Sequence, residues 1–285
     1  MNFSDRLTTV IKKKQSCLLL GLDPNREKLP AIFQAMAAKR IQAGEHETGV
    51  WAELYFHFCR EILEHTDPYI CGIKIQMAYF EALGAAGIAA VEGLIQIAKE
   101  RHLIIVTDGK RGDIGSTCEA YSAAFLADGK LGSDCTTVNP FLGEDGVKPF
   151  LDNCEKNDRG IFVLVKTSNP SANQFQEKIS DDIARQVEKW GTSTRDKNGF
   201  SSIGAVVGAT HKTELKHFRT LMPHSWILSP GIGAQGGSMA DVLDIRINDL
   251  GVIIPVSRSV IYASNDDEFA EKAGDVMKDL WRQQK

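Results

Sequence analysis

The run LIIVTD at residues 103–108 begins with four aliphatic residues and ends on a polar pair. Short runs rich in leucine and β-branched residues, with little hydrophobic alternation, are typical of strands that a parallel sheet buries on both faces. Seven further runs share this pattern, and nearly all lead straight into Gly, Pro, Asn, Asp, Ser or Thr. They are CLLLGLD (17–23), YICGIKI (69–75), DCTTVNP (134–140), GIFVLVK (160–166), SIGAVVG (202–208), SWILSPG (225–231) and GVIIPVS (251–257).

Amphipathic stretches of helical period separate these runs, so strand and helix alternate along the chain. Examples are ELYFHFCREILEH (53–65), AAVEGLIQIAKERH (89–102), CEAYSAAFLADG (118–129) and SDDIARQVEKWG (180–191). Eight such repeats favour a single-domain (β/α)₈ barrel over residues 1–285, with a doubly wound open sheet as the alternative. The extended connection at about 24–68 is long for one loop, and we expect it to hold two helices.

Composition and charge exclude several classes of protein. The 285 residues are 43% hydrophobic, and 37 acidic against 33 basic side chains leave a net charge of −4 without a basic stripe, which disfavours nucleic acid as a partner. Six cysteines without a CxxC pair predict a reducing, cytoplasmic setting. The N-terminal residues lack a secretory layout, and no run approaches the roughly 18 apolar residues of a membrane span, so no membrane role is expected.

The functional groups of a (β/α)₈ barrel lie at the carboxyl ends of its strands. The predicted strand exits are rich in polar residues: Asp23, Lys74, Asp108, Lys110, Asn139, Thr167, Ser168, Ser257 and Arg258. Charges buried at strand ends are costly unless paired, so we expect Lys74, Asp108, Lys110 and Asp113 to converge as a network of alternating charge. An ordinary ion-pair cluster that closes the barrel mouth is the alternative.

A glycine-rich segment, SPGIGAQGG (229–237), follows the seventh predicted strand, and Arg258 follows the eighth. Backbone N–H groups and a guanidinium at these two exits predict a phosphate-binding site. The glycine-rich segment taken alone could equally be a plain tight turn.

The segment DGKRGDI (108–114) resembles the DxKxxDI signature of the orotidine 5'-monophosphate decarboxylase family, and the similarity extends along the whole chain. The other matching segments, in the family's order, are GLDP (21–24), KIQ (74–76), TSNP (167–170), PGIGAQGG (230–237) and SRSVIY (257–262). The long connection at 24–68 resembles the longer bacterial branch. The resemblance implies cofactor-free decarboxylation of orotidine 5'-phosphate to uridine 5'-phosphate, in de novo pyrimidine biosynthesis.

The resemblance also implies roles for individual residues. Lys110 would donate the proton that replaces CO₂, with Asp108 against the departing carboxylate and Lys74 and Asp113 completing a charged tetrad. The substrate-binding residues would be Asp23 and Thr117 for the ribose hydroxyls, Ser168 for the pyrimidine edge, and Gln235 and Arg258 for the phosphate. Asp113 and Thr117 would come from the neighbouring subunit, which implies a homodimer with shared active sites.

Three other readings are open at this stage. A Mg²⁺-dependent hexulose-phosphate synthase shares the DxKxxD segment, but that branch has a glutamate where this chain has Lys74, and an ammonium there would repel the metal. A catalytically silent phosphate-binding barrel would leave the charged residues unexplained. A Schiff-base aldolase acting through Lys166 would leave Lys110 unexplained. The seven histidines show no metal-ligand spacing, so neither a metal nor a cofactor is expected.

Overall fold

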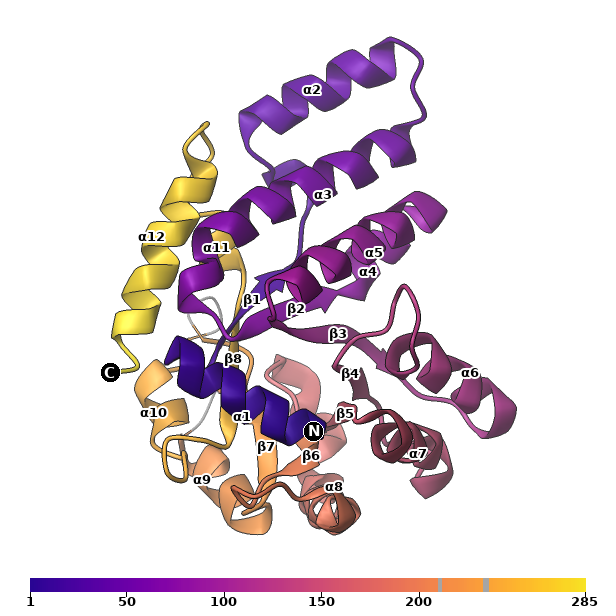
Figure 1. Ribbon diagram of the computed structural model, residues 1–285, viewed down its shortest axis with the longest axis vertical. Coiled ribbons are helices and arrows are strands. Elements are labelled where there is room, and N and C mark those ends of the chain that lie inside the picture. The colour runs from indigo at the N-terminus through magenta and orange to yellow at the C-terminus, as the bar shows by residue number, and fades with distance from the viewer. Residues whose placement is uncertain (210–211, 233–235) are drawn as a thin grey trace.

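A closed barrel of eight parallel strands, paired in sequence order, forms the centre of the computed structural model, which describes residues 1–209, 212–232 and 236–285 (Figure 1). The closure between the first and last strands excludes the open sheet and confirms the predicted barrel. All eight predicted runs form strands. The strands are β1 (Leu18–Leu22), β2 (Gly72–Gln76), β3 (Ile104–Arg111), β4 (Cys135–Val138), β5 (Gly160–Lys166), β6 (Ser201–Val207), β7 (Ser225–Leu228) and β8 (Val252–Val256).

Helices surround the barrel, and most of them connect one strand to the next (Figure 1). They are α1 (Phe3–Lys14), α2 (Ala31–Gln42), α3 (Glu47–Thr66), α4 (Met77–Glu81), α5 (Gly84–Glu100), α6 (Gly115–Leu126), α7 (Lys148–Asn157), α8 (Gln176–Trp190), α9 (Lys212–Leu221), α10 (Met239–Leu243), α11 (Arg258–Ile261) and α12 (Phe269–Arg282). Short 3₁₀ helices lie in the loops: η1 (Arg26–Lys28), η2 (Asp67–Tyr69), η3 (Glu144–Gly146), η4 (Pro170–Gln174) and η5 (Thr192–Thr194).

The long connection at 24–68 contains the two expected helices, α2 and α3. Helix α3 buries Val50, Leu54, Phe58 and Ile62, a spacing of four residues that keeps one face toward the core. This helix packs against α5 and α12, whereas α2 packs on the outside of α3 and projects from the barrel (Figure 1). The long connection therefore enlarges one side of the molecule and leaves the carboxyl ends of the strands uncovered.

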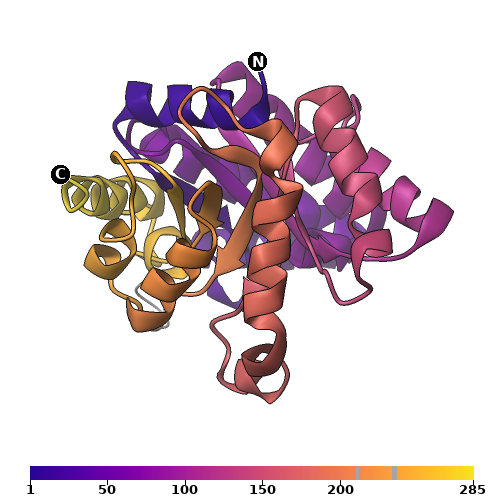
Figure 2. The same ribbon diagram turned by 90° about the horizontal axis from the view of Figure 1, so that it is seen from below.

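Helix α1 lies across the amino-terminal end of the barrel (Figure 2). The side chain of Asn2 caps its first turn by accepting the N–H of Asp5 at 2.9 Å. Phe3 packs edge-on against Phe162 of β5, and the indole N–H of Trp226 in β7 donates to Ser4 Oγ at 2.7 Å. Helix α1 therefore covers this end of the barrel, whereas the carboxyl ends of the strands open into a cavity.

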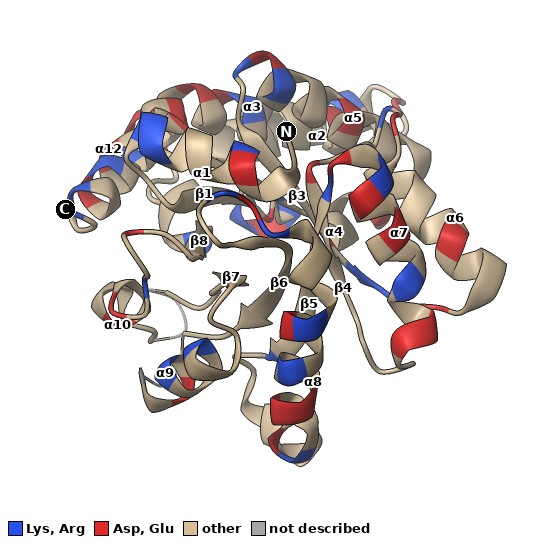
Figure 3. Ribbon diagram, turned by 60° about the horizontal axis from the view of Figure 1, so that its bottom comes forward, with Lys and Arg blue, Asp and Glu red and all other residues tan. Residues whose placement is uncertain are grey.

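Acidic and basic residues are interspersed along the outer helices (Figure 3). The described part of the chain contains no helix that is both long and apolar enough to cross a membrane. All six cysteines are buried and free, as expected for thiols that serve as small apolar residues.

Candidate active site

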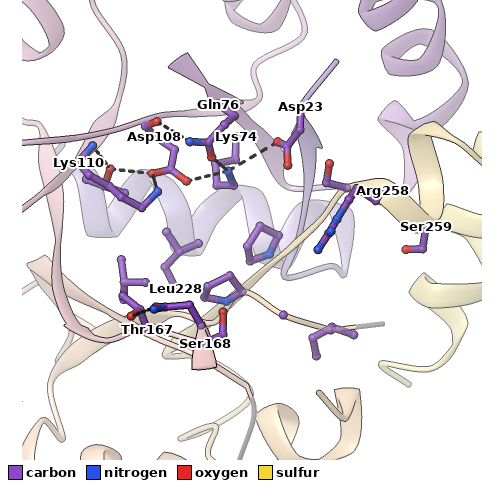
Figure 4. A pocket seen from close by; sticks show the side chains of 18 residues that line it. Asp23, Lys74, Gln76, Asp108, Lys110, Thr167, Ser168, Leu228, Arg258 and Ser259 are labelled. Atoms are coloured by element: carbon purple, nitrogen blue, oxygen red, sulfur yellow. Dashed lines mark hydrogen bonds and ion pairs between the residues drawn. The ribbon is translucent and has the colours of Figure 1, made fainter. Parts of the chain in front are cut away.

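A cavity of about 400 Å³ opens at the carboxyl ends of the strands (Figure 4), a volume typical of a small-molecule site. Every strand, or the loop that follows it, contributes to the wall. The lining residues are Asp23, Lys74, Gln76, Asp108, Lys110, Thr137, Thr167, Ser168, Asn169, Val206, Leu228, Pro230, Gly231, Ile232, Pro255, Ser257, Arg258 and Ser259.

A chain of alternating charges crosses one wall of this cavity (Figure 4). Lys110 Nζ donates to Asp108 Oδ1 at 2.6 Å, and Lys74 Nζ donates to Asp108 Oδ2 at 2.8 Å. Lys74 Nζ also lies 3.9 Å from Asp23 Oδ1. The side chains of Lys74 and Asp108 are 7% and 9% exposed, whereas that of Lys110 is 44% exposed. Lys110 is therefore the member of the chain that a ligand can reach most freely.

The opposite charges of Lys74 and Asp108 offset the cost of burying each of them, so both side chains stay charged. Burial alone would raise the pKa of Asp108, but the ammonium groups of Lys74 and Lys110 outweigh it and hold that pKa well below its usual range. Burial alone would lower the pKa of Lys74, but the carboxylates of Asp108 and Asp23 outweigh it and raise that pKa above its usual value. Both groups are thus ionised at neutral pH.

The fourth residue of the expected cluster does not join it within one chain. Asp113 lies outside the wall of the cavity, where its Oδ1 accepts the N–H of Ile114 at 2.8 Å. Thr117 is exposed on α6 and is also absent from the wall. Within one chain only Lys74, Asp108 and Lys110 of the four residues line the cavity, so the convergence of Asp113 with them stays a prediction that depends on a neighbouring subunit.

The side of the cavity formed by the exits of β7 and β8 carries Gly231, Ile232, Ser257, Arg258 and Ser259. Gly231 has a φ of 106°, which an L side chain rarely adopts, and its carbonyl accepts the N–H of Gly237 at 3.1 Å. Arg258 is the exposed cation on this side. Gln235, the other expected phosphate ligand, lies outside the described residues.

A sequence profile of the orotidine 5'-phosphate decarboxylase / HUMPS family matches residues 18–273. The chain belongs to this family. Two curated relatives, both named orotidine 5'-phosphate decarboxylase, cover nearly the full length. The one from Caldicellulosiruptor saccharolyticus is 39% identical over 279 residues, 92% of this chain and 90% of the relative. The one from Rhodopirellula baltica is 38% identical over 285 residues, 96% of this chain and 92% of the relative. A solved structure of Leishmania donovani OMP decarboxylase superposes with a TM-score of 0.76 at 29% identity, covering 99% and 100% of the two chains.

Within this family, Lys74 and the names of the relatives favour the decarboxylase over the metal-dependent synthase. Lys74 occupies the strand-two position at which the synthase branch would need a metal-binding carboxylate, and its ammonium is already paired with Asp108. Across residues 1–209, 212–232 and 236–285, the structure contains no group of three or more His, Cys, Asp or Glu side chains suited to hold a metal ion. The relatives' names also favour the decarboxylase over the synthase.

The geometry also argues against a Schiff base on Lys166. Its side chain is 8% exposed and is absent from the cavity wall. Lys166 Nζ donates to Asn173 Oδ1 at 2.6 Å and lies 3.8 Å from Glu214 Oε1. The amine of Lys166 is therefore paired outside the wall of the cavity in which a carbonyl substrate would bind.

The segment from Thr167 to Gln176 begins at the wall opposite the charged chain, where Thr167, Ser168 and Asn169 line the cavity, and continues into η4 (Figure 4). Ser168 packs against Gly208, where an added Cβ would come within 2.9 Å of the serine Cβ. The Gln176 side chain accepts the N–H of Thr167 at 2.8 Å and so ties the two ends of the segment together. Ser168 is thereby held at the cavity wall.

Two polar residues that contact the charged chain were not predicted as site residues, and a third residue, predicted at the cavity, lies outside its wall. Gln76 accepts from Lys74 Nζ at 3.0 Å, and Thr137 donates its hydroxyl to Asp108 at 2.9 Å. Asn139, expected at the exit of β4, is exposed and caps its own loop by accepting the N–H of Phe141. Gln76 lay within the quoted KIQ segment and could have been found there, whereas Thr137 carried no signal beyond its place in a strand.

Proposed function

We propose that this protein catalyses the cofactor-free decarboxylation of orotidine 5'-phosphate to uridine 5'-phosphate in de novo pyrimidine biosynthesis. The observation that carries the proposal is the Lys110–Asp108–Lys74 chain of charges in the wall of a cavity, with Arg258 at the exits of β7 and β8. The names and high coverage of the relatives support the same reaction.

In the proposed reaction the bond between ring carbon C6 and the carboxylate breaks, CO₂ leaves, and the electron pair stays on C6. Lys110 then donates a proton from Nζ to form the new C–H bond, and it recovers a proton from water. An ammonium fixed beside C6 stabilises the negative charge as it develops, since the ion pairs have oriented it before the substrate reacts. Asp108 would lie against the departing carboxylate, and Lys74 would keep Asp108 ionised.

The remaining site residues bind the parts of the substrate that do not react. Arg258 and Gln235 would bind the phosphate. Asp23 would hydrogen-bond the ribose hydroxyls, and Ser168 would hydrogen-bond the edge of the pyrimidine. The carboxylate of Asp23 supports this role, because its Oδ1, 3.9 Å from Lys74 Nζ, is buried and has no hydrogen-bond partner among the described residues. A ribose hydroxyl could supply that hydrogen bond. Binding energy from the phosphate could then hold the segment 167–176 over the base.

The active form in this proposal is a homodimer in the cytoplasm, in which Asp113 and Thr117 reach the partner's cavity. Large apolar side chains next to these residues are exposed, namely Ile114 at 56%, Phe141 at 81% and Leu142 at 48%. Exposed apolar residues grouped on neighbouring loops are typical of an interaction surface. The six free, buried cysteines support a reducing compartment.

An ultraviolet assay for loss of orotidine 5'-phosphate absorbance, in excess EDTA, tests the reaction. We expect full activity with the chelator and a loss of at least about 10²-fold in kcat for Lys110→Ala, which removes both the proton donor and the charge beside C6. Loss of activity in EDTA that Mg²⁺ restores would favour the synthase. A Lys110→Ala variant that retains more than about a tenth of kcat, less than about 1.4 kcal/mol in barrier, would remove this lysine as the proton donor.

A further inference from the structure

The catalytic segment of β3 departs from regular strand pairing opposite a single residue of β4. Thr107 pairs with Thr136 and Arg111 pairs with Val138, and the register shifts between these two pairs. Three residues of β3, 108–110, thus face one residue of β4, Thr137. Asp108 and Lys110 both lie in this irregular stretch, so ordinary ladder hydrogen bonds do not determine their orientation.

Lys110 has an unusual backbone conformation within this stretch. Its φ of 48° lies in the left-handed region, which residues other than glycine seldom adopt. Such a conformation persists only where the surrounding structure holds it. A side chain holds this backbone conformation, because the backbone N–H of Lys110 donates to the hydroxyl oxygen Oγ1 of Thr137 at 2.8 Å.

The same hydroxyl group contacts the catalytic carboxylate. Thr137 Oγ1 donates to Asp108 Oδ1 at 2.9 Å, and that carboxylate oxygen also accepts from Lys110 Nζ at 2.6 Å. Since the hydroxyl has one proton, donation to Asp108 leaves its lone pairs free for the Lys110 N–H. Thr137 is 1% exposed, so water does not replace either bond. One buried hydroxyl therefore connects the backbone of Lys110 to the acceptor of its own ammonium.

We infer that Thr137 is a positioning residue of the active site, which acts through Lys110 and Asp108 by holding the ammonium at C6. The inference rests on the proposed decarboxylase function. A serine at this position retains both hydrogen bonds, whereas a valine has nearly the same shape and retains neither. Thr136 offers a matched control, because it is equally buried and its hydroxyl donates to the backbone carbonyl of Thr107 at 2.9 Å, away from the Asp108 carboxylate.

The test compares Thr137→Val, Thr137→Ser and Thr136→Val by steady-state kinetics, thermal unfolding and calorimetric binding. For Thr137→Val we expect a loss of about 10²-fold in kcat, the effect of a misplacement near 1 Å. Because the phosphate and ribose contacts are unchanged, KM and the affinity for uridine 5'-phosphate should change by less than about threefold. Affinity for 6-hydroxyuridine 5'-phosphate, whose ionised oxygen places negative charge at C6, should fall with kcat. Thr137→Ser should stay within about threefold of wild type because it restores both hydrogen bonds.

Thr136→Val should lower the unfolding temperature about as much as Thr137→Val while it keeps the wild-type kcat. If Thr137→Val does not fold, Thr137→Ala carries the same expected kinetic loss. Three results would overturn the inference. The valine or alanine variant could retain more than about a third of kcat, or the serine variant could lose as much kcat as either of them. The third is a loss of kcat in Thr136→Val equal to that in Thr137→Val. An inactive wild-type enzyme would instead overturn the proposed function and this inference with it.

Discussion

Mixing two inactive variants tests whether Asp113 acts across a twofold interface. In one chain the cavity wall contains Lys110 but not Asp113. A site in the proposed dimer therefore takes Lys110 from one subunit and Asp113 from the other. Lys110→Ala and Asp113→Ala are suitable partners, because the first side chain is 44% exposed and the second lies outside the cavity, so neither variant should disturb the core.

The expected recovery follows from the symmetry of the dimer. Random exchange between equal amounts of the two variants makes about half of the dimers mixed. In each mixed dimer one active site contains both substitutions. The other active site combines the intact Lys110 of one chain with the intact Asp113 of its partner. One restored site in half of the dimers predicts about a quarter of the wild-type activity. Each variant alone should remain about 10²-fold or more below wild type.

A mixture of Lys110→Ala with Lys74→Ala is the control, because both lysines line the same chain's cavity. Every site in that mixed dimer still lacks one lysine, so no recovery is expected. Native mass spectrometry establishes that the subunits have exchanged. If the first mixture stays inactive after exchange, or if both mixtures recover equally, Asp113 does not act across an interface and the shared-site proposal is wrong.

Three other predictions use conventional measurements. Arg258→Ala should raise KM for the nucleotide at least about tenfold with a smaller loss in kcat, because a phosphate contact is made in both the ground and the transition state; an unchanged KM would exclude the contact. Arg219→Met should lower the free energy of unfolding by about 3 kcal/mol or more, since its buried guanidinium donates to four backbone carbonyls, and urea denaturation measures this loss. Asp108→Asn should destabilise the fold by a constant amount between about pH 5 and 9, and by less only below about pH 4. Folding lowers the pKa of Asp108, so this carboxylate stabilises the folded state at every pH above the pKa it has in the unfolded chain, and the stabilisation is lost as the pH falls toward its pKa in the folded protein. Folding raises the pKa of Lys74, so the partner ammonium stays charged up to alkaline pH.

The sequence alone was sufficient to predict the barrel and the main chemical groups. The strand-forming runs are local signals, since a continuous aliphatic stretch that ends on polar residues needs burial on both faces wherever it lies. The run at 160–166 became β5 with the same bounds, and the long connection contained two helices as expected. The residues Lys74, Asp108, Lys110, Ser168 and Arg258 could be identified because the carboxyl ends of barrel strands all meet at one face.

The tertiary structure alone decided which side chains at those strand ends face the cavity. Thr137 lies in β4 and lines the cavity, opposite the irregular stretch of β3, whereas Asn139 follows the end of β4 and accepts the N–H of Phe141 in the next loop. Lys166 ends β5, yet it does not line the cavity and instead donates to Asn173. Neighbouring residues of a strand face opposite sides, so a shift of one position reverses the outcome, and the register depends on contacts between strands that are distant in sequence.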